Sequence, residues 1–328
     1  MELDTKSENT SVSPNIPSLT KTDPETGSTV KPSQSIPKQS IPKQSTPKHL
    51  VLSGGGVRGS FYIGFMQHVE QSKCMSFTTL ESVAGTSIGA FVGAAIALGY
   101  RSDELAPFLY RILNYKDNQS LRPLHFFKRF GLDTGERMEY WIKQMILART
   151  GDKCYTFRKL LRERGIELHI FTTCLEDRGI VHLSPKTHPN MKLWKALRMT
   201  MTVPFLFEPF EYRGKHYLDG ALKCNFPIHI HSSRSQKEKE SVLGVHLGGS
   251  QSPLSRGYHF TTYLQSIMDV IIKNSHPVED IPVFYFNTSP PDLPIGSLRH
   301  KLSEEEYQKC IEFGLTLSQE CFASLTKA

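Results

Sequence analysis

Residues 82–100 form a stretch that admits two incompatible structures. It contains no charged side chain over roughly nineteen residues, about the length of a helix that spans a bilayer. It also contains Gly85-Thr86-Ser87-Ile88-Gly89, the G-x-S-x-G spacing of a nucleophile elbow, in which a serine stands on a tight turn between a strand and a helix. A bilayer span needs one unbroken helix, whereas an elbow needs the chain to turn at the serine.

The composition of this stretch favours the elbow. Glycine recurs along it, and the part from Ile88 onward that can be helical is only about eleven residues long, too short to cross a bilayer. Gly85 and Gly89 flank Ser87 as the turn requires, because such a turn leaves no room for Cβ atoms on either side. We therefore expect a short strand, the elbow and a small-residue helix, and not a transmembrane segment at 82–100.

The composition of the whole chain excludes some function classes. With 38% apolar and 22% charged residues it is typical of a globular protein that buries a core. The net charge of +7 and the isoelectric point near 9.0 suit an anionic partner. No basic block with interleaved aromatic residues is present, so nucleic acid is not expected as a partner. Anionic phospholipid headgroups fit the charge at least as well.

The cysteines and the N-terminus indicate a compartment. The six cysteines are scattered without a C-x-x-C pair, which argues against a zinc site and against a disulfide framework. The first residues, MELDTKSENT, are polar and lack the apolar segment of a signal peptide. We expect an intracellular (cytoplasmic) protein without a bound metal.

The chain divides into two compositional regions. Residues 1–47 are rich in Ser, Thr, Pro and Lys and end in the near-repeat SIPKQSIPKQSTPKH. Such a segment buries too little apolar surface to offset its chain entropy, so we expect a disordered tether. The alternative is a loose contact with anionic lipid through Lys31, Lys38, Lys43 and Lys48, which have no acidic residue between them. Residues 48–328 are expected to form one domain.

Apolar periodicity in this domain predicts alternating strands and helices. Buried or alternating runs predict strands near residues 49–53, 81–84, 166–175, 179–185, 216–219, 241–249 and 281–289. Helical spacing predicts helices near residues 57–71, 88–98, 101–115 with Ser102 as its cap, 134–150, 156–165, 193–201 and 303–322, the last with a Ser303–Glu306 capping box. This alternation indicates an α/β sandwich with at least a partly parallel sheet.

A glycine-rich turn, SGGGVRGS, follows the first predicted strand. Gly54, Gly56 and Gly59 satisfy G-x-G-x-x-G, the spacing of a dinucleotide-binding turn. The same turn also aims several backbone N–H groups at one negative charge, which is either a phosphate or the oxyanion of a tetrahedral intermediate. Arg58 adds a positive charge that a dinucleotide turn does not need. The elbow about thirty residues later favours the oxyanion.

A serine nucleophile needs a base. No histidine stands in a context that marks it as a triad member, although His229, His231 and His246 remain open. The motif YLDGAL offers Asp219 on a turn, where Asp-Gly alone predicts no more than the turn. A carboxylate is a weak base in water, so the site would have to desolvate it and raise its pKa.

The three motifs in this order resemble the patatin-like phospholipase family. They are Gly54-Gly55-Gly56-Val57-Arg58-Gly59, then Gly85-Thr86-Ser87-Ile88-Gly89, then Asp219-Gly220-Ala221, and the stretch MTVPFLFEPFEYRGKHYLDGA is also similar to that family. The resemblance covers about residues 48–228, and the remaining residues carry no family signature. It implies a three-layer α/β sandwich with a mostly parallel central sheet.

The resemblance also implies a chemistry. Ser87 would be the nucleophile and Asp219 its proton acceptor, in a dyad without histidine. The backbone around Gly54, Gly55, Gly56 and Gly59 together with Arg58 would form the oxyanion hole, with Gly85 and Gly89 at the elbow and Gly220 at the turn. The substrate would be a phospholipid or acylglycerol, cleaved without calcium or another cofactor. A lipid transacylase using the same dyad and a non-catalytic lipid- or nucleotide-binding module remain the alternatives.

The segment LRPLHFFKRFGL mixes aromatic and basic residues. Phe126, Phe127 and Phe130 lie beside Lys128 and Arg129, a composition suited to a membrane interface. The alternative is that these phenylalanines fill the core beside the next helix. The first interpretation predicts a peripheral contact with an anionic membrane.

Overall fold

The computed structural model describes residues 46–114, 126, 128–248, 263, 266–267, 270–271, 281–288, 290, 293 and 302–326. The chain separates into two compact units, 1–38 and 39–328, and every described residue belongs to the second. The predicted tether over residues 1–47, apart from Thr46 and Pro47, lies outside the described residues.

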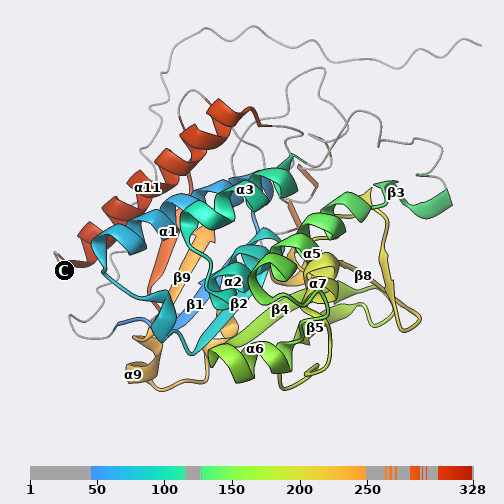
Figure 1. Ribbon diagram of the computed structural model, residues 1–328, viewed down its shortest axis with the longest axis horizontal. Coiled ribbons are helices and arrows are strands. Elements are labelled where there is room, and N and C mark those ends of the chain that lie inside the picture. Colours follow the sequence, from blue (N-terminus) through green and yellow to red (C-terminus); the bar gives the residue numbers. More distant parts are fainter. Residues whose placement is uncertain are drawn as a thin grey trace, which may run out of the picture. The chain divides into compact units, whose positions relative to one another are not determined.

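A mostly parallel sheet forms the centre of the second unit (Figure 1), as the sequence predicted. Its strand order is β10-β9-β1-β2-β4-β8-β7, with β5 also paired to β4. The parallel strands are β1 (His49–Leu52), β2 (Ser82–Thr86), β4 (Glu167–Cys174), β9 (Val242–Leu247) and β10 (Val283–Phe286). The antiparallel strands are β5 (Gly179–Leu183), β7 (Phe210–Tyr212) and β8 (Lys215–Asp219).

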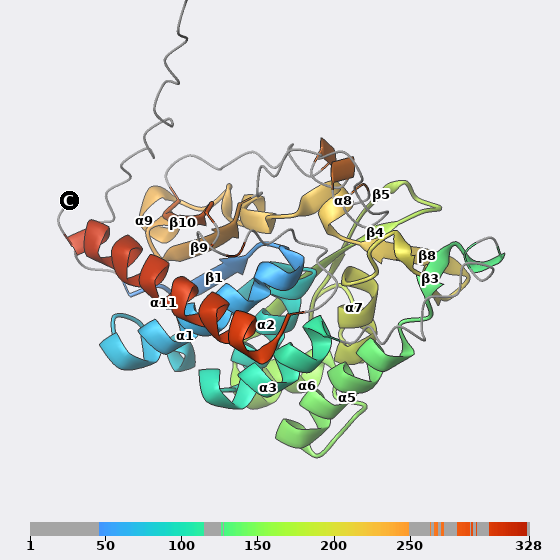
Figure 2. The same ribbon diagram turned by 90° about the horizontal axis from the view of Figure 1, so that it is seen from above.

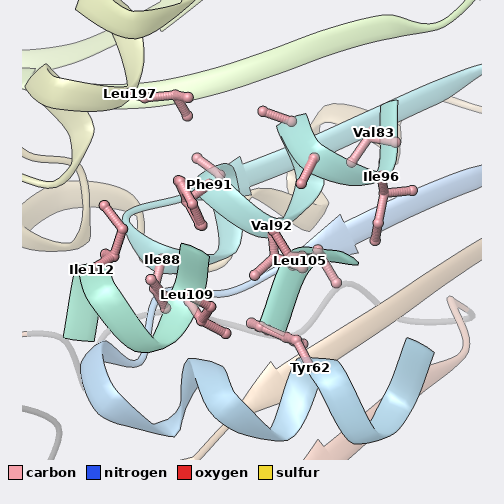
Figure 3. Packing of buried hydrophobic residues seen from close by; sticks show 14 of the residues in the cluster. Tyr62, Val83, Ile88, Phe91, Val92, Ile96, Leu105, Leu109, Ile112 and Leu197 are labelled. Carbon is pink, nitrogen blue, oxygen red and sulfur yellow. The ribbon is translucent and has the colours of Figure 1, made fainter. Parts of the chain in front are cut away.

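Helices cover one face of this sheet, and Figure 2 shows them gathered on that side. They are α1 (Phe61–Ser72), α2 (Ile88–Leu98), α3 (Ser102–Leu113), α5 (Glu136–Thr150), α6 (Phe157–Arg164), α7 (Leu193–Thr200) and α11 (Glu304–Thr326). Fully buried Leu50, Leu52 and Val83 project from the strands into this layer. Helix α2 is buried along its whole length, and Figure 3 shows its Ile88 and Val92 near Tyr62 of α1 and near Leu105 and Leu109 of α3. Its burial on all sides explains why its sequence lacks charge.

The other face has a thinner cover. Val51 and Ala84 alternate with the residues of the first face, because successive strand side chains point to opposite sides. They pack against Phe226 and Ile228, which belong to the segment around the short helices α8 (Ala221–Cys224) and η3 (Pro227–His231), while α9 (Gln236–Lys239) follows. Both faces of the parallel sheet are therefore covered, as such sheets require.

The C-terminal helix belongs to the same unit. Helices α1 and α11 lie side by side (Figure 1) and approach at two glycines. A Cβ on Gly64 would lie 2.1 Å from the Ile311 carbonyl oxygen, and one on Gly314 would lie 2.4 Å from the Phe61 carbonyl oxygen. Ser303 and Glu306 form the predicted capping box, with the Ser303 amide donating to Glu306 and the Glu306 amide donating to Ser303.

The uncharged stretch 82–100 is divided between β2 and α2, as the elbow interpretation predicted. Among the residues that the structure describes, no helix has both the length and the apolar character needed to cross a membrane.

Two features differ from the sequence prediction. Ser102 does not cap α3: the cap residue is Arg101, and the Ser102 hydroxyl instead donates to Glu70 of α1 at 2.7 Å. A second, two-stranded sheet of β3 (Gly131–Asp133) and β6 (Phe205–Phe207) was not predicted. Three-residue strands are too short to show a period in sequence.

Candidate active site

Strand pairing brings Ser87 and Asp219 together. Strand β2 runs parallel to β4 and ends where Thr86 pairs with Phe171. Strand β8 runs antiparallel to β4 and ends where Asp219 pairs with Thr172, the next residue of β4. Because β5 occupies the other edge of β4 at these positions, β2 and β8 share one edge and meet end to end. The serine that follows β2 therefore faces the aspartate that ends β8.

Ser87 has the backbone of a nucleophile elbow. Its φ of 53° and ψ of −127° place a residue other than glycine in a strained region. Its side-chain Oγ donates to Asp219 Oδ2 at 2.7 Å, and the residue is only 8% exposed. Helix α2 begins at the next residue, so its positive end lies directly behind the hydroxyl.

Glycines make this turn sterically feasible. A Cβ on Gly85 would lie 2.7 Å from the Ala90 nitrogen, and a Cβ on Gly89 would lie 2.4 Å from the Ser53 carbonyl oxygen. A Cβ on Gly220 would lie 2.1 Å from the Phe171 carbonyl oxygen. Since backbone atoms at these distances cannot move aside cheaply, all three positions are restricted to glycine.

The buried carboxylate of Asp219 accepts hydrogen bonds from two neutral donors. Its Oδ2 accepts from Ser87 and its Oδ1 accepts from the Ala221 amide at 2.8 Å. Burial raises the pKa of this carboxyl group to about 7, while these two hydrogen bonds act in the opposite direction. A carboxylate with that pKa is a far better base near neutral pH than one in water. The desolvation that the sequence argument required is thus present.

Two threonines that the sequence analysis did not single out support the pair. The Ser87 amide donates to Thr200 Oγ1 at 2.8 Å, and the Thr200 hydroxyl donates in turn to the Phe171 carbonyl. The Asp219 amide donates to the Thr202 carbonyl at 2.7 Å. The end of α7 therefore holds the backbone of both residues of the pair. A threonine in a helical sequence carries no signal for such a role.

The glycine-rich turn lies against Ser87. A Cβ on Gly54 would lie 3.3 Å from Ser87 Cβ, and one on Gly59 would lie 2.4 Å from Ile88. The Gly54 amide donates to the Asn225 carbonyl at 3.0 Å, and the Arg58 amide donates to the Gly55 carbonyl at 3.2 Å. Those two amides are therefore engaged within the protein.

The remaining part of the turn is shaped by Gly55 and Gly56. Gly56 has a φ of 55°, and a Cβ on Gly55 would lie 2.5 Å from the Leu247 side chain. Arg58 is 4% exposed, in the 3-10 helix η1 (Gly56–Ser60). Burial, together with the Arg58 charge, lowers the pKa of His246 to about 4. The guanidinium thus supplies a buried positive charge beside this turn.

The histidines that the sequence left open lie elsewhere. His231 Nδ1 accepts from Arg234 at 2.9 Å, His229 contacts Cys224 at 3.8 Å, and His246 packs between Phe226 and Tyr285. The position beside Ser87 Oγ is taken by Asp219. Within the described ranges, no group of three or more His, Cys, Asp or Glu side chains is placed to hold a metal ion.

A match to a protein-family model shows which family the chain belongs to. The model described as patatin-like phospholipase matches residues 50–231, which is more than half of the chain and includes both Ser87 and Asp219. The chain belongs to the patatin-like phospholipase family. The resemblance drawn from the three motifs is confirmed.

The curated relatives that the chain resembles differ in how much of their length the chain covers. The chain is 24% identical over 212 residues to the probable lipid hydrolase 463L of invertebrate iridescent virus 6, covering 60% of this chain and 68% of that protein. It is 28% identical over 214 residues to lysophospholipase NTE1 of Yarrowia lipolytica, covering 64% of this chain but 13% of that protein. The match to protein R571 of Acanthamoeba polyphaga mimivirus covers 60% of that relative. The chain thus spans less than two thirds of some curated relatives.

The patatin-like fold extends over most of the chain. The crystal structure of VipD from Legionella pneumophila superposes with a TM-score of 0.53 at 15% identity, covering 90% of this chain and 72% of that one. At this identity the likeness concerns the fold alone.

Proposed function

We propose that this patatin-like protein is a lipid acyl hydrolase that cleaves carboxylic esters through a Ser87–Asp219 dyad. The observation that carries the proposal is the 2.7 Å hydrogen bond from Ser87 Oγ to a buried carboxylate whose pKa is raised to about 7. A serine nucleophile is activated when its hydroxyl donates a hydrogen bond to a base whose pKa is near neutral. The names of the viral and yeast relatives, a lipid hydrolase and a lysophospholipase, support a lipid ester as substrate.

In the first half-reaction, Asp219 accepts the Ser87 proton while Oγ attacks the ester carbonyl carbon. The carbonyl oxygen becomes an oxyanion, which the amides of Gly55 and Gly56, the Arg58 charge and the N-terminus of α2 stabilise. Collapse of this intermediate expels the alcohol, which takes the proton from Asp219. The product is an acyl-enzyme on Ser87.

In the second half-reaction, Asp219 accepts a proton from water, which attacks the acyl carbonyl carbon. The oxyanion forms again at the same donors, and its collapse returns the proton to Ser87 Oγ and releases the fatty acid. The residues require no metal for these steps, because the base, the nucleophile and the oxyanion donors are all supplied by the chain.

A fluorophosphonate probe tests the proposal, because it forms a covalent bond with an activated serine. We expect the probe to label the wild-type chain and not the Ser87→Ala variant. Ser82→Ala is the matched control, because it removes a buried serine at the start of β2, the strand that Ser87 follows. Equal labelling of wild type and Ser87→Ala would contradict the assignment. Absence of labelling in all three proteins would favour a non-catalytic module.

Product analysis distinguishes hydrolysis from acyl transfer. With a radiolabelled acyl ester, a hydrolase releases free fatty acid whether or not a lipid alcohol is present. A transacylase instead transfers the label to the added alcohol. Both reactions pass through the acyl-enzyme, so the dyad is common to them.

A further inference from the structure

Two phenylalanines are exposed on the small sheet that the sequence did not predict. Phe130 directly precedes β3 and is 66% exposed, and Phe205 begins β6 and is 47% exposed. They are neighbours, because Gly131 pairs with Phe205 in the two-stranded sheet. Phe126 is half-buried beside them, with its ring 6.1 Å from that of Phe205. Phe130 therefore does not fill the core, while Phe127 lies outside the described residues.

Both exposed phenylalanines also have strained backbones. Their φ angles are 60° for Phe130 and 63° for Phe205, in the left-handed region that bulky residues rarely adopt. Glycine, which has no Cβ, would relieve the strain and would expose less apolar surface to water. Strained residues of this kind concentrate at functional surfaces.

Basic side chains lie on the same turn. The Phe130 amide donates to the Phe126 carbonyl at 2.8 Å, which closes a helical turn that carries Lys128 and Arg129. Both are exposed, and Arg129 lies 3.9 Å from the mostly buried Glu208. We call Phe126, Lys128, Arg129, Phe130 and Phe205 the aromatic–basic patch. Its chemistry is complementary to a bilayer with anionic headgroups, which accepts aromatic rings at the interface and attracts cations.

The aromatic–basic patch is connected to the dyad through the chain that follows α7. The Thr202 carbonyl accepts the Asp219 amide, and Phe205 follows only three residues later. Since successive Cα atoms are about 3.8 Å apart, the Cα atoms of Thr202 and Phe205 lie within about 11 Å.

A buried arginine joins both strands of the small sheet to this chain. Arg198 is 2% exposed, and it donates through Nη1 to Thr202 Oγ1 at 2.6 Å and through Nη2 to the Thr134 carbonyl at 2.9 Å. Thr134 directly follows β3. Thr202, which accepts the Asp219 amide, is thus tied through Arg198 to the residue that follows β3.

We propose that the aromatic–basic patch is the surface by which the protein docks on an anionic phospholipid bilayer. This proposal rests on the proposed function in that the docked lipid is the source of the substrate. The phenylalanine rings enter the interface, Lys128 and Arg129 contact the headgroups, and the rigid connection through Arg198 keeps the dyad beside the bilayer.

Vesicle co-sedimentation of the full chain in the Ser87→Ala background tests the docking without consuming the lipid. The vesicles are phosphatidylcholine alone, and phosphatidylcholine mixed in equal parts with phosphatidylserine. We expect Phe130→Asn/Phe205→Asn to weaken partitioning onto the mixed vesicles by about tenfold or more. We expect Lys128→Gln/Arg129→Gln to weaken it by about fivefold per charge on the mixed vesicles only.

The controls distinguish a role of the aromatic–basic patch from the effects of lost net charge and of lost folding stability. Lys237→Gln/Lys239→Gln removes the exposed Lys237 and the partly exposed Lys239 of α9, before the start of β9, and should bind the mixed vesicles as the parent does. The melting temperature of the asparagine variant should equal or exceed that of the parent, because asparagine tolerates a positive φ better than phenylalanine. Esterase assays on the wild-type chain test the catalytic proposal separately.

Three results would overturn the docking proposal. They are a parent that does not bind the mixed vesicles, an asparagine variant that binds them as tightly as the parent, and a change in oligomeric state of that variant with unchanged vesicle binding. The last result would identify the patch as a contact between copies of the chain. If the fluorophosphonate probe fails to label the wild-type chain while the parent binds the mixed vesicles, the result contradicts the catalytic proposal alone.

Discussion

Ser87 Oγ lies 2.7 Å from Asp219 Oδ2, although 132 positions separate the two residues in the chain. The contact follows from the pairing of β2 and β8 with adjacent residues of β4. Because both residues are at least 92% buried, the hydroxyl and the carboxylate interact with little screening by water. Their protonation state should therefore control the chemistry of the site.

The pH dependence of ester hydrolysis should report the ionisation of Asp219. Burial raises the pKa of this carboxyl group to about 7, and only its deprotonated form can accept the Ser87 proton. We expect kcat/KM on a soluble short-chain ester to rise about tenfold per pH unit below pH 7 and to level off above it. A rate that was already constant from pH 5 to pH 8 would contradict a base of this pKa.

The same group should make stability depend on pH. The pKa of Asp219 is higher in the folded protein than in the unfolded chain, so folding favours the protonated form. Its contribution to stability is present below pH 4 and is lost as the pH rises through about 7, by about 4 kcal/mol at most. Urea unfolding at several pH values should show this loss in wild type and not in Asp219→Asn. If the unfolding free energies of wild type and Asp219→Asn vary with pH in the same way, Asp219 does not contribute this pH dependence.

Thr200 should act as a positioning residue for the elbow. Thr200→Val removes the oxygen that accepts the Ser87 amide and leaves a buried donor unpaired, at a cost of about 1–3 kcal/mol in stability. We expect kcat to fall by about tenfold or more while KM changes little, since the displaced group is Ser87, the proposed nucleophile. Thr200→Ser keeps the hydroxyl and should restore kcat. A purely structural role would leave kcat unchanged in the valine variant that still folds.

The close approach at Gly89 can be tested against a glycine in open space. A Cβ on Gly89 would lie 2.4 Å from the Ser53 carbonyl oxygen, whereas one on Gly151 would meet no atom within 4 Å. Gly151 has a φ of 68°, so Gly151→Ala should cost only about 1 kcal/mol of backbone strain. Thermal unfolding should show a substantially larger decrease in melting temperature for Gly89→Ala than for Gly151→Ala. Equal melting temperatures for the two variants would mean that α2 can move away from the end of β1 at a lower energetic cost than the structure indicates.

The sequence was sufficient for the elements with strong patterns. The strand at 49–52 and the helix at 88–98 were predictable because burial on both sides demands continuous apolar runs. The capping box at Ser303 was predictable because it depends on local spacing. The family motifs pointed to Ser87 and Asp219 because each motif includes glycines that a tight turn needs.

Features that depend on contacts between distant segments could not be predicted from the sequence. The hydrogen bond from the Ser87 amide to Thr200 requires the end of α7 to reach the end of β2, and no local pattern records that contact. The exposure of Phe130 depends on the small sheet that pairs Gly131 with Phe205, two segments more than seventy positions apart. An aromatic residue in sequence predicts a core position as readily as a surface one.

The central claim is that Asp219 is the base that activates Ser87, and the most direct measurement is kcat/KM of Asp219→Asn on a soluble short-chain ester. Asparagine keeps the size and the hydrogen-bonding capacity of the side chain but cannot accept the proton. We predict a loss of about 10⁴-fold or more, with thermal stability preserved. A folded Asp219→Asn protein with kcat/KM within tenfold of wild type would show that another group accepts the proton, and would contradict the dyad.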